Sequence, residues 1–465
     1  MRVHAFGDDA LGEYDAVGLV EALHRHEVSV PEVVEASIGR VEKVAGELDP
    51  VAIELYDRAR AEAADPRSGY FAGVPTLVKD NCDLAGVPTM HGTDAWTPKP
   101  AKEDGDWARM FLATGLLPIA KSRLSEYGFS ASAEHPRLGP VRSPWSTDHT
   151  AGASSAGSAA LVAAGAVPLA HANDGGGSIR IPASVNGLVG LKPTRRRFAQ
   201  DKTFRDMPVQ IVQDGVLTRS VRDTAAFVRE AERVYRNVAL APIGDLTRPA
   251  KRRLRIAMNT SGVGQSADPE VTALTEQTAR LLEDLGHHVE EVDPPVSQTF
   301  ADDFLLYWAF LAFFMVRAGR MQHGRSFDRS RLDNLTLGLA RFTRRNLHHL
   351  PRAITRLKHT AVESDLFHQK YDVALTPTLA IPTPRIGWLD PTQTYDEIMD
   401  RLLQWVAFTP LQNATGAPAV SLPLATTSTG LPQGMMFGAG AGQEPVLIEL
   451  AYELEEARPW ARIQD

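Results

Sequence analysis

The sequence predicts an α/β protein in which helices cover a sheet. Between residues 70 and 225, short apolar runs alternate with Gly/Ser-rich loops and Ala-rich helical stretches, the pattern of strands packed under helices. The composition is ordinary for a globular protein, with 43% hydrophobic and 23% charged residues. Because neither an internal repeat nor a low-complexity linker divides the chain, we expect residues 1–465 to form a single domain.

Hydrophobic periodicity places the elements of this fold in order along the chain. Apolar residues recur at helical spacing over 16–64, where Ser29 and Pro31 would start the second helix. Gly286 would end a later amphipathic helix. Strands are expected at 76–78, 117–120, 167–170, 188–191, 253–258 and 371–376, and further helices at 268–285, over most of 300–368 and at 445–457.

Charge and residue usage exclude several classes of protein. A net charge of −8 argues against a nucleic-acid binder, which normally has a basic surplus. The single cysteine, Cys82, can form no intramolecular disulfide, and a cysteine-based zinc cluster is excluded. The longest apolar run, 304–316, is shorter than the ~20 residues of a membrane span and predicts a buried helix or a pocket wall. We therefore expect a cytoplasmic protein that neither binds nucleic acid nor enters a membrane.

The most unusual stretch is Asn173-Asp174-Gly175-Gly176-Gly177-Ser178-Ile179-Arg180, which follows a predicted strand. Consecutive glycines allow a sharp turn that directs several N–H groups to one point. A serine beside such donors suits nucleophilic acyl transfer, where the donors stabilise an oxyanion. A plain flexible loop or a phosphate-binding turn is the alternative, although the Walker and dinucleotide fingerprints are absent.

Two other segments carry polar groups of interest. Ser154 and Ser155 precede an Ala-rich stretch, where a serine most often caps a helix. Lys79 ends an apolar run at 76–78. If Lys79 is buried, desolvation lowers its pKa, and the neutral amine can act as a general base. The ordinary role of such a lysine is to reach solvent from a strand end.

Together these segments resemble the amidase signature family. Residues 152–194 read GASSAGSAALVAAGAVPLAHANDGGGSIRIPASVNGLVGLKPT, and the family's upstream lysine segment is matched by GVPTLVKD at 73–80. Similar stretches continue at 214–225, at 371–378 and near the C-terminus, so the resemblance covers nearly the whole chain. It implies an amidase-signature fold, with a central mixed, twisted sheet covered by helices on both faces and a core at about 70–225.

The resemblance also implies a role for each matching residue. Ser178 would be the nucleophile, Ser154 a bridging serine that follows a cis peptide bond, and Lys79 the base that starts the relay. The backbone N–H groups of Gly175, Gly176, Gly177 and Ser178 would form the oxyanion hole. Neither a metal nor a cofactor is required. Supporting, loop-organising roles fall to Ser155, Asp174 and Arg180.

The sequence departs from the family pattern at a few positions. Ala153 and Ala156 stand where the family usually has glycine, and Asn173 stands where threonine or serine is common. Arg195 to Arg197 replace an aromatic residue or a glycine. None of these changes removes a catalytic atom, so they bear on the substrate rather than on the chemistry.

A histidine is the rival base, because a Ser-His-Asp triad is recognised by geometry and not by spacing. His135, His149 and His171 lie closest in sequence to the two serines. The family match supplies a complete relay without any of them, and we expect these histidines to be packing or surface residues.

The substrate follows less directly from the sequence. Aromatic residues in the helical region 300–360 are suited to line an acyl or aryl pocket, or else to pack in the core. We expect a small carboxamide, anilide or cyclic amide, as for bacterial amidases of the kind that includes cyclic-dimer nylon hydrolases. A glutaminase subunit of a tRNA-dependent amidotransferase and a catalytically silent binding protein are the alternatives. A homodimer is also left open.

Overall fold

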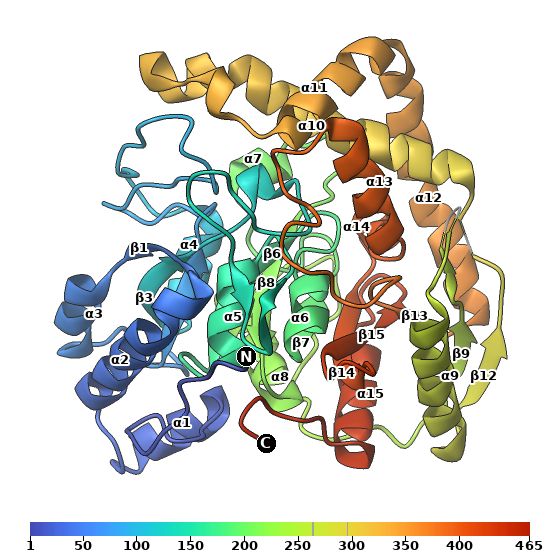
Figure 1. Cartoon of the computed structure of the whole chain (residues 1–465). Helices are drawn as coiled ribbons and strands as arrows, with labels where there is room; N and C mark the ends of the chain where they lie inside the picture. The colour runs from blue at the N-terminus through green and yellow to red at the C-terminus, as the bar shows by residue number, and fades with distance from the viewer. Residues whose placement is uncertain (263–264, 295) are drawn as a thin grey trace.

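A mixed eight-stranded sheet forms the centre of the computed structural model, which describes residues 1–262, 265–294 and 296–465 (Figure 1). In the order β12-β9-β13-β15-β14-β7-β8-β6, the first three strands are parallel and each later neighbouring pair is antiparallel. The strands are β6 Leu169–Asp174, β7 Val189–Lys192, β8 Gln213–Thr218, β9 Arg255–Met258, β12 His288–Glu291, β13 Val373–Pro377, β14 Ala419–Thr426 and β15 Pro432–Ala439.

Helices cover both faces of this sheet, which confirms the predicted fold class. Neighbouring side chains of one strand show the two faces, because Val216 and Leu217 belong to two different hydrophobic cores. Val216 packs with residues of α8 and α15, whereas Leu217 packs with the alanines of α5. The helices are α8 Val221–Val234, α9 Pro269–Asp284 and α15 Glu444–Ala457 on one face, and α5 Ala156–Ala163 and α6 Arg180–Asn186 on the other.

A second sheet of three strands, which the strand pattern does not distinguish from the first, lies beside β6. Its order is β1 (Val51–Glu54), β3 (Leu117–Ser122) and β2 (Pro75–Lys79). The hydroxyl of Thr76 donates to the carbonyl of Leu169 at 2.9 Å, so β2 is held against β6. The region 16–64 is therefore not helical throughout: β1 interrupts helices α1 Ala16–His24, α2 Val30–Leu48 and α3 Tyr56–Ala63.

Helix boundaries follow the expected signals. Ser29 and Glu32 form a capping box at the start of α2, and Asp268 accepts the N–H of Glu270 where α9 begins. Gly286, just beyond α9, has a φ of +90°, a conformation that glycine adopts without strain. The short remaining elements are α4 Asp106–Ala113, α7 Lys202–Arg205, β4 Arg142–Ser143, β5 Ser146–Thr150, β10 Ser261–Gly262, β11 Gln265–Ser266 and 3₁₀ turns at Glu126–Gly128, Gly324–Ser326, Arg329–Arg331 and Leu347–His349.

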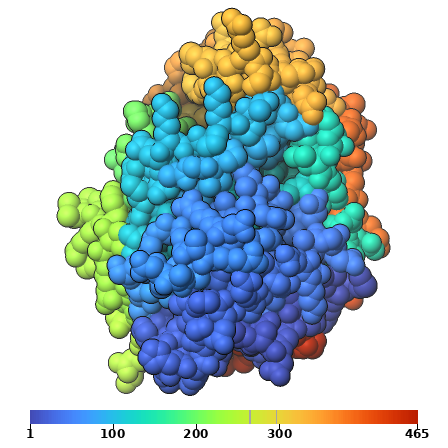
Figure 2. Space-filling view, turned by 90° about the vertical axis from the view of Figure 1, so that its left-hand side faces the viewer, coloured from blue at the N-terminus to red at the C-terminus, as the bar shows by residue number. Residues whose placement is uncertain are grey.

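A layer of long helices lies above one end of the sheet, shown in gold and orange in Figures 1 and 2. In Figure 2 this layer sits above the N-terminal part of the chain, coloured blue. By length and composition alone, one helix in the described residues, Gln298–Ser326, is long and apolar enough to cross a membrane. Most of this segment is helix α10, which packs against the next two long helices, α11 and α12. The layer consists of α10 Gln298–His323, α11 Asn334–Asn346 and α12 Leu350–Lys370, with α13 Tyr395–Trp405 and α14 Pro410–Thr415 beside it.

Candidate active site

Ser178 lies in the tight connection between the end of β6 and the start of α6. Gly177 makes this connection possible, because its φ is +134° and a side chain there would meet the Thr409 hydroxyl at 2.4 Å. The side chain of Ser178 is mostly buried, at 9% exposure, yet it borders a cavity. The loop therefore presents the Ser178 hydroxyl to a cavity, and its conformation requires glycine at position 177.

Asp174 and Arg180 hold this loop from within. The Arg180 guanidinium donates to both carboxylate oxygens of Asp174 at 2.9 Å, and both side chains are fully buried. Asp174 also accepts from the Nδ2 of Asn413 and from the N–H groups of Gly177 and Ile179. Although burial opposes ionisation, the charge and hydrogen bonds of Arg180 lower the pKa of Asp174 well below its usual range. Asp174 and Arg180 thus form a buried ion pair that holds the loop in place.

The backbone around Ser178 leaves a group of N–H donors for an oxyanion. Three residues of the loop border the cavity, namely Gly175, Gly176 and Ser178. In the described part of the chain, their backbone N–H groups donate to no protein acceptor. Gly177 differs from its neighbours, because its N–H is donated to Asp174 at 2.7 Å. Of the four donors expected from the sequence, three are therefore unengaged among the described residues, because Asp174 accepts the N–H of Gly177.

Lys79 ends β2, and its ammonium group is completely enclosed. Its Nζ lies 2.7 Å from the Oγ of Ser154, 2.9 Å from the Oγ of Ser155 and 2.6 Å from the Oδ1 of Asn173. The structure therefore brings Lys79 together with both serines, although they are 75 and 76 residues away in sequence.

Burial changes the acid-base behaviour of Lys79. Desolvation lowers its pKa from 10.5 to about 7, and the carboxylates of Asp214 and Asp174 oppose this shift only in part. A lysine with a pKa near 7 is partly neutral at physiological pH. The group can therefore accept a proton, which an exposed lysine cannot do efficiently.

Ser154 lies between Lys79 and the cavity. The Ala153–Ser154 peptide bond is cis, and Ser155 is the N-cap of α5. Both Ser154 and Ser178 border the cavity, but in the described residues no hydrogen bond joins their hydroxyls. Ser155 instead donates to the backbone carbonyl of Ser178 at 2.6 Å. Catalytic hydrogen bonds are often loose until substrate is present.

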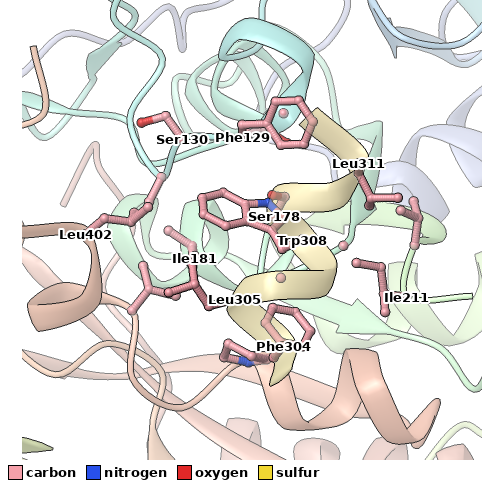
Figure 3. A pocket seen from close by; sticks show the side chains of 18 of the residues that line it. Phe129, Ser130, Ser178, Ile181, Ile211, Phe304, Leu305, Trp308, Leu311 and Leu402 are labelled. Carbon is pink, nitrogen blue, oxygen red and sulfur yellow. The ribbon is translucent and has the colours of Figure 1, made fainter. Parts of the chain in front are cut away.

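The cavity beside Ser178 has a volume of about 380 Å³, and its wall is largely apolar. In Figure 3, α10 crosses in front of Ser178 and carries Phe304 and Trp308 on the side of the pocket. The helix thus forms a pocket wall, one of the two roles that the apolar run at 304–316 predicted. Among the described lining residues, Asp302 alone carries a charge. Further apolar lining comes from Phe129, Ile181, Ile211, Leu305, Leu311 and Leu402.

Comparison with known proteins decides the family. The sequence model of the family described as Amidase matches residues 32–448. The chain belongs to this amidase family.

The relatives of this amidase fit that assignment. It is 60% identical over 464 residues, 100% of this chain and 99% of the relative, to "Putative amidase AmiC" of Mycobacterium leprae. It is 32% identical to the 6-aminohexanoate-cyclic-dimer hydrolase of Paenarthrobacter ureafaciens, over 96% of this chain and 95% of that one.

Two solved structures are similar along almost their whole length. The 6-aminohexanoate cyclic dimer hydrolase complexed with substrate superposes with a TM-score of 0.88 at 28% identity, and 98% of each chain is covered. A bacterial aryl acylamidase of the amidase signature family superposes with a TM-score of 0.86 at 27% identity, and 97% of each chain is covered. The protein is thus a hydrolase that acts on amide carbon–nitrogen bonds.

The amidase contains polar residues at its centre that sequence reasoning missed. Asn173 was noticed only as a departure from the family pattern, yet its side chain contacts Lys79 and pairs with Asn81. Thr409 donates to the carbonyl of Gly176, and Asn413 contacts Asp174. These contacts join segments more than 90 residues apart, so no local pattern announces them.

The histidines near the serines have other tasks in this amidase. His171 accepts the backbone N–H of Lys79 through Nδ1, so its neutral ring carries the proton on Nε2, 3.1 Å from Asp214. His149 contacts Ser146, and His135 accepts two backbone N–H groups of its own loop. None of these three contacts Ser178 or borders the described cavity. Their placement leaves Lys79 as the basic group beside the serines.

One buried cluster in the described residues has metal-like spacing. Ligand atoms of Glu126, His135 and Asp333 lie within 4.8 Å of one another. However, Nδ1 of His135 accepts the N–H groups of Arg137 and Leu138. A neutral ring with that pattern carries its proton on Nε2, so it has no free lone pair for a cation. The donor set therefore does not suit a metal.

Proposed function

We propose that this amidase hydrolyses neutral amides flanked by apolar groups, through an acyl-enzyme on Ser178. The observation that carries the proposal is the completely buried amine of Lys79, 2.7 Å from Ser154, beside a serine with unengaged N–H groups. Ser178, the bridging Ser154 and the oxyanion donors thus border one cavity, and Lys79 contacts Ser154 from behind, an arrangement that suits acyl transfer.

In the first step, neutral Lys79 accepts the proton of Ser154 while Ser154 takes the proton of Ser178. The Ser178 oxygen attacks the amide carbon, and the negative charge develops on the carbonyl oxygen. The N–H groups of Gly175, Gly176 and Ser178 stabilise that oxyanion, and each well-placed donor contributes about 3 kcal/mol in comparable sites. The relay then delivers a proton to the leaving nitrogen, and the carbon–nitrogen bond breaks.

Deacylation uses the same groups in reverse order. Water enters where the amine left, and Ser178 becomes the leaving group. The relay accepts the water proton and returns a proton to the Ser178 oxygen, so the enzyme regains its starting state. Asp174 and Arg180 take no part in these transfers, and they keep the loop in place.

The cavity supports an uncharged substrate. A charged group costs several kcal/mol to bury without a partner, and the described wall offers only Asp302, an exposed side chain at the start of α10. Aromatic and aliphatic side chains from α10 suit an aryl, alkyl or cyclic group. The names of the related proteins, a cyclic-dimer hydrolase and an aryl acylamidase, support the same substrate class.

The two alternatives are disfavoured by particular observations. A glutaminase must bind a substrate with an α-carboxylate, and no lysine or arginine is among the described lining residues. A silent binding protein would not need a buried lysine in contact with two serine hydroxyls.

A panel of amides tests the proposal. The panel varies the acyl and amine halves and includes acetanilide, a long-chain anilide, a cyclic diamide and glutamine, with Ser178→Ala as the blank. We expect the apolar amides to be cleaved with the highest kcat/KM and glutamine to be left intact. Equal turnover by Ser178→Ala, or a preference for glutamine, would contradict the proposal.

We also propose a cytoplasmic location, because the one cysteine is buried and free, as suits a reducing compartment. Whether the enzyme forms a homodimer stays a prediction, which light scattering of the purified protein tests. A measured molar mass equal to that of one chain would exclude a homodimer.

A further inference from the structure

We propose that Asn173 is a positioning residue that aims the lone pair of Lys79 at Ser154, with Asn81 holding the Asn173 amide in the required orientation. This inference rests on the proposed function, because it concerns how Lys79 acts as a base. It assigns a task to an asparagine at a position where threonine or serine is common in the family.

The hydrogen bonds that Lys79 can make depend on its charge. An ammonium group has three N–H donors, whereas a neutral amine has two donors and one lone pair. Nζ has three close side-chain neighbours, the oxygens of Ser154, Ser155 and Asn173. All three are satisfied when Lys79 is charged. When it is neutral, one neighbour must instead donate a proton to the lone pair.

Two of the three neighbours cannot donate. The Ser155 hydroxyl uses its proton on the carbonyl of Ser178, at 2.6 Å, and therefore accepts from Lys79. The Oδ1 of Asn173 is a carbonyl oxygen and can only accept. The two N–H groups of the neutral amine are thus bound to Ser155 and Asn173. Ser154 is the remaining partner, and its O–H must face the lone pair.

The orientation of the Asn173 amide is itself fixed. Its Nδ2 donates to the Oδ1 of Asn81 at 3.1 Å, and the Nδ2 of Asn81 lies 3.3 Å from the Oδ1 of Asn173. A flipped Asn173 amide would face Lys79 with a donor and would lose the bond to Asn81. Asn173 is also 4% exposed, so water can replace neither contact easily. The amide pair thereby favours the orientation in which Asn173 presents its Oδ1 to Lys79.

The charge of the residue at position 173 gives the sharpest test. Asn173→Asp keeps the shape but places a carboxylate against Nζ, which favours the ammonium form. We expect the pH at which Lys79 loses its proton to rise by about one unit or more. Above that pH the aspartate oxygen accepts an N–H as the amide oxygen did, so the rate should recover. A residue with a merely structural role would lower the rate at every pH without moving the profile.

The experiment measures the rate at which a fluorophosphonate labels Ser178 between pH 5.5 and 10. The Ser178 oxygen forms a bond to phosphorus, fluoride leaves, and the proton passes through Ser154 to Lys79. Wild type should show a rate that rises through a pKa near 7. Asn173→Asp should show the same rise at a higher pH. The control is Asn237→Asp, which introduces the same charge at a residue that does not border the described cavity. Its labelling rate should match that of wild type at each pH.

Two further variants keep the test decisive if Asn173→Asp does not fold. Asn173→Ala removes the acceptor and should lower the alkaline plateau about 10- to 100-fold, as expected when a reacting group loses its alignment. Asn81→Ala should lower the plateau several-fold, because it removes only the group that orients Asn173. An unshifted profile in folded Asn173→Asp, or a wild-type plateau in Asn173→Ala, would overturn the inference. Failure of wild type to label would instead overturn the proposed function.

Discussion

At the scale of single residues, the environment of Lys79 decides what the site can do. An ordinary lysine is already protonated at neutral pH and has no lone pair to accept a proton unless something lowers its pKa, and complete burial does so here. The sequence indicated Lys79, Ser154 and Ser178 because each sits in a distinctive local motif. It could not indicate how Asn173 contacts Lys79, because 94 residues separate the two and only the fold brings β2 beside β6.

The pKa of Lys79 predicts how activity depends on pH. An ammonium group has no lone pair, so the base is lost when Lys79 is protonated. Activity should therefore be high above pH 7 and should fall as the pH drops through the pKa of about 7. A profile of kcat/KM from pH 5 to 9 measures this limb. A profile that rises toward acid pH would contradict the assignment. Lys79→Met should lower kcat by at least about 100-fold at every pH.

Arg180 should matter for stability more than its distance from the reacting atoms suggests. Arg180→Met leaves the carboxylate of Asp174 buried without its cation, which costs about 3–5 kcal/mol in comparable buried pairs. Urea denaturation measures the change in the free energy of unfolding. Arg385→Met is the control, because the Arg385–Asp148 pair is exposed and should contribute less than about 1 kcal/mol. Equal effects of the two changes would contradict this reading of the loop.

At the scale of elements, the connection between β6 and α6 and the wall formed by α10 carry different tasks. The glycine run predicted the sharp turn, and the structure adds that Gly177 is the member with a positive φ. The apolar run at 304–316 predicted a buried helix or a pocket wall, and α10 serves as the wall. Sequence alone could not decide between the two, because both require the same apolar composition.

Neighbouring glycines should respond differently to alanine. Gly177→Ala forces a side chain into a left-handed conformation and against Thr409, which should destabilise the fold by about 1–3 kcal/mol and abolish labelling of Ser178. Gly176 does not have a positive φ, and the atom nearest to an added methyl group is the Cζ of Phe304 at 4.0 Å. Gly176→Ala should therefore fold normally. Thermal unfolding of both variants checks the contrast, and a similar loss in each would refute it.

The wall formed by α10 should select the substrate rather than the chemistry. Trp308→Ala removes an aromatic side chain from the cavity, so kcat/KM for an anilide should fall roughly 10-fold or more, mainly through KM. Acetamide should be affected much less. The control is Phe314→Ala, because Phe314 lies on the same helix but is 48% exposed and does not border the described cavity. An equal loss for both variants, or for both substrates, would show that α10 does not choose the substrate.

At the scale of the whole molecule, the alternating strand and helix pattern was sufficient for the fold class but not for the topology. The three-stranded sheet was missed because β1 is four residues long and lies between amphipathic helices. The strand β1 forms by pairing with β3, whose partner residues lie 66 to 71 positions further along the chain, and local periodicity does not reveal such a pairing. The expectation of one domain over 1–465 stays a prediction, which a single cooperative unfolding transition would support.

Removal of metal ions tests the chemistry of the whole molecule. The proposed relay uses only side chains and backbone groups, and the cluster of Glu126, His135 and Asp333 lacks a free imidazole lone pair. Dialysis against EDTA should therefore leave both kcat and the melting temperature unchanged. A loss of activity that zinc restores would contradict this reading of the cluster.

The most direct test of the central claim is to trap the acyl-enzyme. The amidase is mixed with an apolar anilide, quenched in acid within one turnover and digested, and the modified residue is located by mass spectrometry. We expect the acyl group on the peptide that contains Ser178 in wild type, and no adduct in Ser178→Ala. An acyl group on another residue, or turnover by Ser178→Ala, would contradict the assignment of Ser178 as the nucleophile.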